Sequence, residues 1–158
     1  MFVRYFIELP LSADRVEEVI CASPASWIPG IADEATARGV HLLGEIGLGE
    51  RARLHRVAVE LGEPMRLPSR TVLPIRWRPT TGDGLLPALD ADIEVARLTP
   101  ESAQLSMSAR YVPAGRAHGN SVDRGILHRV AEATVKDFID RVGAMLIGSA
   151  ASVGSPPR

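Results

Sequence analysis

Cysteine and lysine are nearly absent from this sequence, and aromatic residues are scarce. The 158 residues include one cysteine, Cys21, and one lysine, Lys136, against seventeen arginines, and aromatic side chains make up 4% of the chain. A single cysteine cannot form an internal disulfide and cannot by itself hold a zinc ion. The preference for arginine over lysine indicates a bacterial genome of high GC content.

Long apolar runs are also missing. No stretch approaches the roughly 18 consecutive apolar residues that span a membrane, and residues 2–11 carry Arg4 and Glu8 and lack the cleavage region of a secretory signal. The apolar fraction of 46% and the charged fraction of 23% are ordinary for a globular protein. We therefore expect a cytoplasmic protein with one domain over residues 1–147. Residues 148–158 are small, polar and proline-rich, which predicts a flexible tail.

Residues 2–39 predict a strand followed by two short helices. Residues 2–9 are β-rich and apolar on both faces, which predicts a strand buried on both sides. Ser12 is a suitable N-cap for a helix that runs to about residue 22.

The second helix is expected after a break in the chain. Pro24 and Pro29 interrupt the sequence around Trp27. Residues 31–39 then predict a short helix that ends at its terminal glycine.

The middle of the sequence predicts an antiparallel sheet. Between residues 41 and 113, apolar and polar residues alternate in four segments, 55–61, 71–78, 89–96 and 105–111. This alternation is typical of a sheet that is covered on one side. Hairpins centred on Gly84 and on Pro100 segregate apolar from charged residues. The predicted pairs are Trp77 with Ala91, Ile75 with Ile93, Leu73 with Val95, Arg78 with Asp90, Arg76 with Asp92, Ile93 with Met107, Leu89 with Tyr111 and Asp90 with Arg110.

A long helix is predicted from residue 121 to residue 147. Its apolar residues share one stripe at helical spacing. They are Ile126, Leu127, Val130, Ala131, Thr134, Val135, Phe138, Val142, Met145 and Leu146, with Arg129, Glu132, Lys136 and Asp140 on the opposite side. A helix of about 27 residues is roughly 40 Å long and can cross a small sheet. The pattern as a whole predicts an α+β domain in which a curved antiparallel sheet wraps around this helix.

This order of elements resembles the START/SRPBCC superfamily, the helix-grip group that includes polyketide cyclase-like and lipid-transfer-like domains. The resemblance rests on the opening strand followed by residues 12–18, on Trp27-Ile28-Pro29, and on residues 105–113 leading through a glycine-containing loop into residues 123–131. It covers residues 1–147. It implies a cavity between sheet and helix that holds an apolar or amphipathic ligand, but no particular activity, because members range from binders to cyclases to regulatory partners.

The candidate ligand contacts are the residues expected on the inner side of the sheet and helix. They are Trp27, Arg53, His55, Val57, Leu73, Ile75, Trp77, Ile93, Met107, Tyr111, Arg124, Leu127, Ala131, Thr134 and Phe138.

Two basic residues of this set are expected beside aromatic and apolar partners. Centring the connection between the first two segments of the sheet near residue 65 places His55 opposite Ile75 and Arg53 opposite Trp77. An arginine beside a tryptophan can hold an anionic or carbonyl head group. Alternatively, Arg53 reaches solvent at a twisted strand end.

The other polar candidates each have two interpretations. Arg124 lies on the buried side of the helix by angular position and either contacts a ligand at one end of the cavity or forms an ion pair. Tyr111 either donates a hydrogen bond to a ligand or places its hydroxyl at the rim of the core. Trp27 either closes the mouth of the pocket or packs on the surface.

Other kinds of site find little support. The histidines, His41, His55, His118 and His128, show neither metal-ligand spacing nor a helical pairing with glutamate. Residues 47–52 match G-x-G-x-x-A, but no acidic residue lies about 20 positions on and no alternating strands and helices follow. Asp90, Asp92 and Glu94 face arginines on the polar face, where a solvated charge ladder explains them. We therefore predict no metal, no cofactor and no catalytic residue.

The expected partner is an apolar small molecule of unknown identity. A net charge of −1 and the absence of an aromatic stacking platform argue against nucleic acid. The leading hypothesis is binding of a lipid- or polyketide-like compound by a monomer or homodimer. The alternatives are a cyclase- or aromatase-like enzyme, in which Arg53, His55 or Tyr111 handles protons, and a protein–protein interaction module without a ligand.

Overall fold

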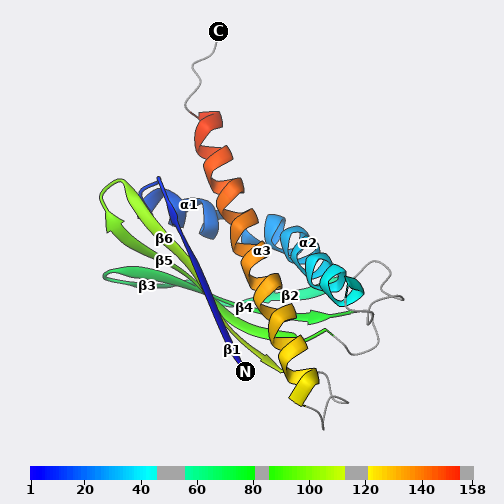
Figure 1. The fold of residues 1–158 in the computed structure, drawn as a ribbon. Helices are drawn as coiled ribbons and strands as arrows, with labels where there is room; N and C mark the ends of the chain where they lie inside the picture. Colours follow the sequence, from blue (N-terminus) through cyan, green and yellow to red (C-terminus); the bar gives the residue numbers. More distant parts are fainter. Residues whose placement is uncertain (46–55, 81–85, 113–120, 154–158) are drawn as a thin grey trace.

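The described residues form a curved antiparallel sheet and three helices (Figure 1). The computed structural model describes residues 1–45, 56–80, 86–112 and 121–153. The elements in chain order are β1 (Phe2–Leu9), α1 (Ala13–Ala22), α2 (Pro24–Glu45), β2 (Val57–Leu61), β3 (Met65–Leu67), β4 (Arg70–Pro79), β5 (Ala88–Thr99), β6 (Ser102–Val112) and α3 (Ser121–Val153). The predicted α+β architecture, with two helices after the first strand and a long C-terminal helix, is confirmed.

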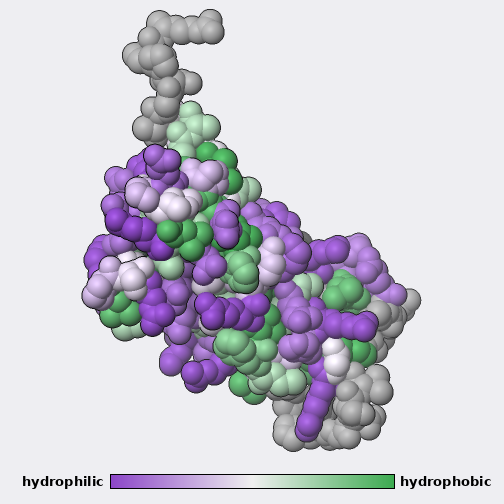
Figure 2. Space-filling model, turned by 60° about the vertical axis from the view of Figure 1, so that its left-hand side comes forward, coloured by the Kyte–Doolittle hydropathy of each residue, from purple (hydrophilic) through white to green (hydrophobic). Residues whose placement is uncertain are grey.

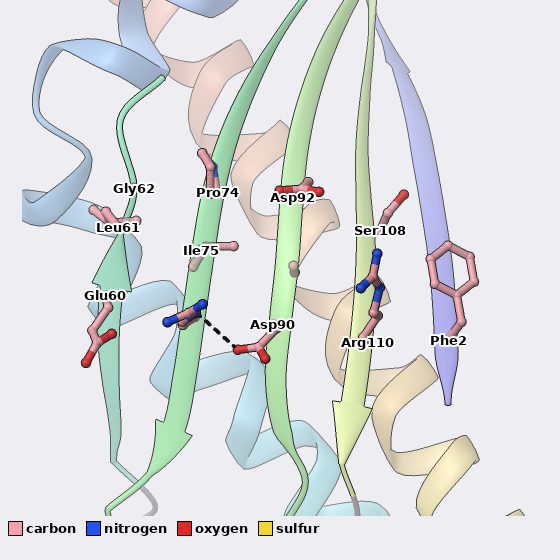
Figure 3. A pocket seen from close by; sticks show the side chains of 12 residues that line it. Phe2, Glu60, Leu61, Gly62, Pro74, Ile75, Asp90, Asp92, Ser108 and Arg110 are labelled. Carbon is pink, nitrogen blue, oxygen red and sulfur yellow. Dashed lines mark ion pairs between the residues drawn. The ribbon is translucent and has the colours of Figure 1, made fainter. Parts of the chain in front are cut away.

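The strands follow the order β1-β6-β5-β4-β2, and β3 also pairs with β4. All of these pairs are antiparallel. The first and last strands of the chain are therefore neighbours. Strand β1 forms one edge of the sheet, and β2 and β3, both paired with β4, form the other. Seen from the outer face of the sheet, the helices lie behind the strands (Figure 3). The inner face is thus the one that the helices cover.

The predicted register of β5 and β6 is confirmed. Leu89 lies opposite Tyr111 and Ile93 lies opposite Met107. Polar residues of the other face match as well, since Asp90 lies opposite Arg110. The alternation of side chains and the short turn around Pro100 were sufficient to fix this pairing.

The predicted register of β4 and β5 is wrong by two residues. Trp77 lies opposite Leu89 rather than Ala91, and Ile75 lies opposite Ala91 rather than Ile93. A shift of two residues keeps every side chain on its face, because side chains of a strand alternate with a period of two. The faces were therefore predicted correctly while the partners were not. The predicted turn centre, Gly84, is outside the described residues.

The predicted register of β2 and β4 is also wrong. Val59 lies opposite Trp77 and Leu61 lies opposite Ile75, the positions that had been assigned to Arg53 and His55. The cause is β3, an unpredicted strand in the connection, which pairs with residues 70–72 of β4 and lengthens the hairpin. Arg53 and His55 themselves lie outside the described residues.

The outer face of β1 is exposed, contrary to the prediction that this strand is buried on both sides. Phe2 and Phe6 are 57% and 54% exposed. Val3 and Leu9 on the inner face are buried, and Tyr5 and Ile7 are partly buried. The difference arises because β1 is an edge strand and a helix covers only one of its faces.

Helix α2 is longer than predicted at both ends. It begins at Pro24, where a missing N–H group costs nothing, and it continues past Pro29 and Gly39 to Glu45. The period-two pattern expected from residue 41 is therefore wrong for residues 41–45. Gly39 does not end the helix but lies against Thr134 and Val130 of α3. By contrast, α1 begins as predicted, because Ser12 Oγ accepts a hydrogen bond from the backbone N–H of Arg15 at 3.3 Å.

Helix α3 crosses the inner face of the sheet and extends beyond the predicted end (Figure 1). It remains helical through Val153, so residues 148–153 do not belong to an extended tail. The predicted apolar stripe is buried from Leu127 to Leu146, and Ile126 and Met145 are partly buried. Arg129, Glu132 and Lys136 face solvent.

Among the helices described, none has the length and apolar character needed to cross a membrane. Figure 2 shows a surface on which small groups of hydrophobic residues are separated by hydrophilic ones.

Candidate functional site

The predicted inner-face residues come together in one buried cluster between the sheet and α3. Trp77 of β4 packs edge-on against Phe138 of α3, with ring centroids 5.3 Å apart. Both side chains are at most 2% exposed. The other predicted ligand contacts buried around this pair are Val57, Leu73, Ile75, Ile93, Met107, Tyr111, Leu127, Ala131 and Thr134. Alternation in the strands and helical spacing in α3 thus identified the inner surface correctly.

Polar groups are few on this surface. The Thr134 hydroxyl donates a hydrogen bond to the backbone oxygen of Val130 one turn earlier, at 2.7 Å, so it is already satisfied within α3. The Thr71 hydroxyl, at the other end of β4, donates to Glu17 of α1. The phenol of Tyr111 is the remaining buried hydroxyl on the inner face of the described strands.

Tyr111 begins a chain of polar contacts that leads from the core to the surface. Its hydroxyl lies 2.9 Å from Nδ1 of His128, and Nε2 of His128 lies 3.2 Å from Oε1 of Glu132. Tyr111 is 1% exposed, whereas the His128 and Glu132 side chains are 42% and 55% exposed. The prediction that no histidine pairs with a glutamate on one helix is therefore wrong, and the spacing of four residues between His128 and Glu132 was the signal that could have revealed this chain.

The protonation of His128 decides the direction of these hydrogen bonds. When the imidazole is neutral and Nε2 donates to Glu132, Nδ1 carries a lone pair and the Tyr111 hydroxyl donates to it. When the imidazole is protonated, Nδ1 donates to the hydroxyl oxygen, and the phenol proton is free to point elsewhere. Met1 Sδ, 3.0 Å from the hydroxyl, is one acceptor in that case. Burial, followed by the negative charge of Glu132, raises the pKa of Tyr111 and keeps the phenol protonated.

Two of the remaining candidates, Arg124 and Trp27, lie in the described residues. Arg124 is exposed, so its placement on the buried side of α3 is wrong. Angular position gives the direction of a side chain on a helix, but it does not reveal whether another element covers that side chain. Trp27 lies within α2 and is partly buried against the core, and its Nε1 has no hydrogen-bond partner among the described residues. Arg53 and His55 are outside the described residues.

The outer face of the sheet carries a concave surface with a volume of about 620 Å³ (Figure 3). Its lining residues are Phe2, Glu60, Leu61, Gly62, Pro74, Ile75, Arg76, Asp90, Ala91, Asp92, Ser108 and Arg110. Asp90 pairs with Arg78 at 2.9 Å and with Arg76 at 3.6 Å, and these side chains are about half exposed or more. The charges on this surface therefore largely neutralise one another in solvent, as expected for a charge ladder.

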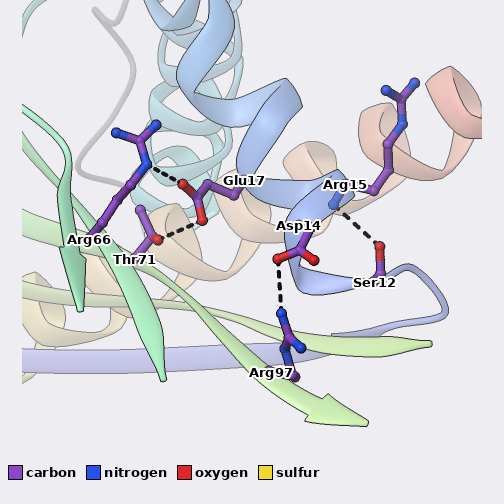
Figure 4. A network of polar contacts seen from close by, with 7 residues as sticks. All are labelled: Ser12, Asp14, Arg15, Glu17, Arg66, Thr71 and Arg97. Atoms are coloured by element: carbon purple, nitrogen blue, oxygen red, sulfur yellow. Dashed lines mark hydrogen bonds and ion pairs between the residues drawn. The ribbon is translucent and has the colours of Figure 1, made fainter. Parts of the chain in front are cut away.

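Helix α1 is attached to the sheet by a polar network (Figure 4). Asp14 binds Arg97 of β5 at 2.9 Å. Glu17 accepts hydrogen bonds from Thr71 of β4 at 2.8 Å and from Arg66 of β3 at 2.5 Å. On the opposite side of α1, Val16 and Ile20 are buried in the core. The network thus holds α1 over one end of the inner face, remote from Tyr111.

Replacing Glu17 with glutamine is expected to remove part of the acid sensitivity of the fold. The hydrogen bond from Thr71, and then the contacts with Arg66, lower the pKa of Glu17 below its usual value of 4.5 in spite of partial burial. A carboxylate with a lowered pKa stabilises the folded state above its unfolded pKa, and this contribution is lost as the pH falls through the folded pKa. Glu17→Gln should therefore cost about 1 kcal/mol at pH 7 and nothing at pH values below the folded pKa.

Urea denaturation of both proteins between pH 7 and pH 2.5 measures this difference. Glu18→Gln is the control, because Glu18 is 68% exposed and pairs only with Arg15 of its own helix among the described residues. An effect of Glu17→Gln that persists unchanged at the lowest pH would contradict the assignment.

The described residues contain no group of three or more histidine, cysteine, aspartate or glutamate side chains placed to hold a metal ion.

Solved structures share the fold of this chain. No protein-family model matches the sequence, and no curated protein matches it either. Among solved structures, the chain is similar to the Zhui aromatase/cyclase from Streptomyces sp. R1128, with a TM-score of 0.56, 15% identity and 99% of both chains covered. The fold is START/SRPBCC-like. A conserved protein from Geobacillus kaustophilus shares this helix-grip fold, with a TM-score of 0.53, 17% identity and coverage of 94% of this chain and 97% of the other.

Proposed function

We propose that this protein binds an apolar or amphipathic small molecule between the inner face of the sheet and α3. The observation that carries the proposal is the composition of that face, which is apolar along its length and has the buried hydroxyl of Tyr111 at one end. An apolar surface with a few well-placed polar groups is typical of small-molecule sites. The helix-grip fold, shared with a protein named as an aromatase/cyclase, supports the same conclusion.

The apolar side chains and the Tyr111 hydroxyl of the inner face indicate the class of ligand. The apolar part of a lipid- or polyketide-like molecule packs against side chains such as Trp77, Met107 and Phe138. An oxygen of the ligand accepts a hydrogen bond from Tyr111 when His128 is protonated, or donates one to the phenol oxygen when His128 is neutral. Because the inner-face side chains are covered in this structure, binding requires α3 or the ends of the strands to move apart from one another. We place this binding in the cytoplasm, as the sequence predicts.

An enzymatic role is the second candidate, and the contact chain from Tyr111 through His128 to Glu132 favours it. A buried phenol in contact with an imidazole that reaches solvent can give a proton to a bound molecule and recover it from outside. A cyclase- or aromatase-like reaction requires such transfers to and from a carbon chain.

A third candidate is an interaction module without a ligand. The near-complete burial of Trp77, Phe138 and their neighbours favours it, because a core that is filled by its own side chains has no need of a small molecule.

Native mass spectrometry of the purified protein is expected to detect a bound apolar compound, and Tyr111→Phe should reduce its occupancy. Losing one hydrogen bond weakens binding roughly tenfold. The matched control is Tyr5→Phe, which removes a phenol hydroxyl that binds Asp140 on the surface and should leave occupancy unchanged.

The same measurement separates the three candidates. A compound that keeps both its mass and its chromatographic retention after incubation supports binding alone. One whose mass or retention changes in the wild type but not in Tyr111→Phe supports an enzyme, because ring closure alone conserves mass and the loss of water that follows does not. A protein that takes up no compound from a lipid extract or from a set of aromatic polyketides would refute both and leave the interaction module.

A further inference from the structure

Strand β1 presents an unusually open edge. It is eight residues long and has only β6 beside it among the described strands. Its outer face carries Phe2 and Phe6, each more than half exposed. Exposed edge strands with apolar side chains tend to pair with another strand.

The backbone groups that face this open edge can be identified. Met1 and Tyr111 exchange two backbone hydrogen bonds, of 2.9 and 3.1 Å. In an antiparallel ladder such pairs recur at every second residue. The odd-numbered residues of β1 therefore bond to β6, and the N–H and C=O groups of Phe2, Arg4, Phe6 and Glu8 point away from the sheet.

The opposite edge of the sheet is shorter and partly blocked. It consists of two short strands, β3 with three residues and β2 with five. The first N–H group of β2, that of Val57, donates to Asp33 of α2 at 2.8 Å. Contacts of this kind block strand addition, and β1 has none among the described residues.

We propose that β1 is the interface of a homodimer, in which the β1 strands of two copies pair antiparallel about a twofold axis through Phe6. In this register Arg4 of each copy lies opposite Glu8 of the other, and the two Phe6 side chains meet on the axis. All three pairs use the backbone groups that face the free edge, which gives about six hydrogen bonds between the copies. The result is one continuous sheet across both copies.

Charge complementarity selects this register over its neighbours. A twofold axis perpendicular to the sheet allows only shifts that keep outer-face residues opposite one another. Moving the axis by one residue, to Tyr5 or Ile7, places Arg4 or Glu8 opposite Phe6. Moving it to Arg4 or Glu8 sets like charges against each other, which is destabilising. Only an axis through Phe6 pairs both charges with opposite partners.

Analytical ultracentrifugation of charge-exchange variants tests the proposal. The wild type should sediment at about twice the 17.0 kDa mass of the chain. Arg4→Glu and Glu8→Arg should each sediment as monomers at the same concentration, because each sets like charges opposite one another twice. The double variant Arg4→Glu/Glu8→Arg should dimerise again.

A mixing experiment adds a readout that misfolding cannot imitate. The two monomeric single variants should form a heterodimer when combined, because every charged pair between them is then of opposite sign. Circular dichroism verifies that each variant is folded. A monomeric wild type, single variants that remain dimeric, or single variants that stay monomeric on mixing would each overturn the proposed interface.

Discussion

Replacing Trp77 with alanine is expected to lower the free energy of unfolding by about 3–5 kcal/mol. The indole is 2% exposed and touches Phe138 edge-on, so it joins the middle of the sheet to α3. Alanine removes this contact and leaves a space that neighbouring strands fill only in part. Urea denaturation followed by circular dichroism measures the change.

The control for this experiment is Leu98→Ala. Leu98 is an apolar residue of β5 in the same sheet, but it is 45% exposed and lies away from the edge formed by β1. Its loss should change the free energy of unfolding by no more than about 0.5 kcal/mol. A similarly small effect for Trp77→Ala would mean that the indole borders a space which water or a ligand already fills. The experiment thus also bears on the choice between a ligand-binding protein and an interaction module.

The sequence predicted which face of each strand is buried, because apolar residues favour the buried face and polar residues favour the exposed one. Ile75, Ile93 and Met107 are buried as expected. The partners across strands depend on the connections instead. The short turn at Pro100 allowed one register. The connection from β2 to β4 contained β3, whose three residues are too few for an alternating pattern to be recognised and are all exposed.

The limits of the helices were predicted less well for a related reason. Pro29 and Gly39 were interpreted as helix breakers from their intrinsic preferences. In the fold, Gly39 lies where α2 and α3 approach each other closely, and packing against α3 outweighs the preference. A single sequence does not reveal which glycines serve such contacts.

The candidate site was predicted in part. Tyr111 was identified because strand parity places it on the inner face, but its partner His128 was not. Arg124 was misplaced, because helical angle gives the direction of a side chain but not whether another element covers it. The open edge of β1 was not predicted, because a sequence does not show the order of strands in a sheet and the apolar side chains of Phe2 and Phe6 were interpreted as core residues.

Replacing Gly39 with leucine is expected to destabilise the fold by about 1–3 kcal/mol or more. A Cβ atom at this position would lie 2.5 Å from Thr134 Oγ1 and 3.1 Å from Val130 Cγ1 of α3. The Thr134 hydroxyl cannot easily move away, because it is bonded to the Val130 backbone oxygen. The larger side chain must therefore push α2 away from α3, and the buried stripe between the two helices opens.

Gly30→Leu on the same helix isolates this packing effect. Gly30 is exposed, and a Cβ atom there would meet nothing within 4 Å. Leucine favours the helix over glycine by up to about 1 kcal/mol, so this variant should be as stable as the wild type or more stable. The same helical preference applies at position 39, and any net loss there comes from contact with α3. Equal stability of the two variants in urea denaturation would show that α2 and α3 do not approach each other this closely in solution.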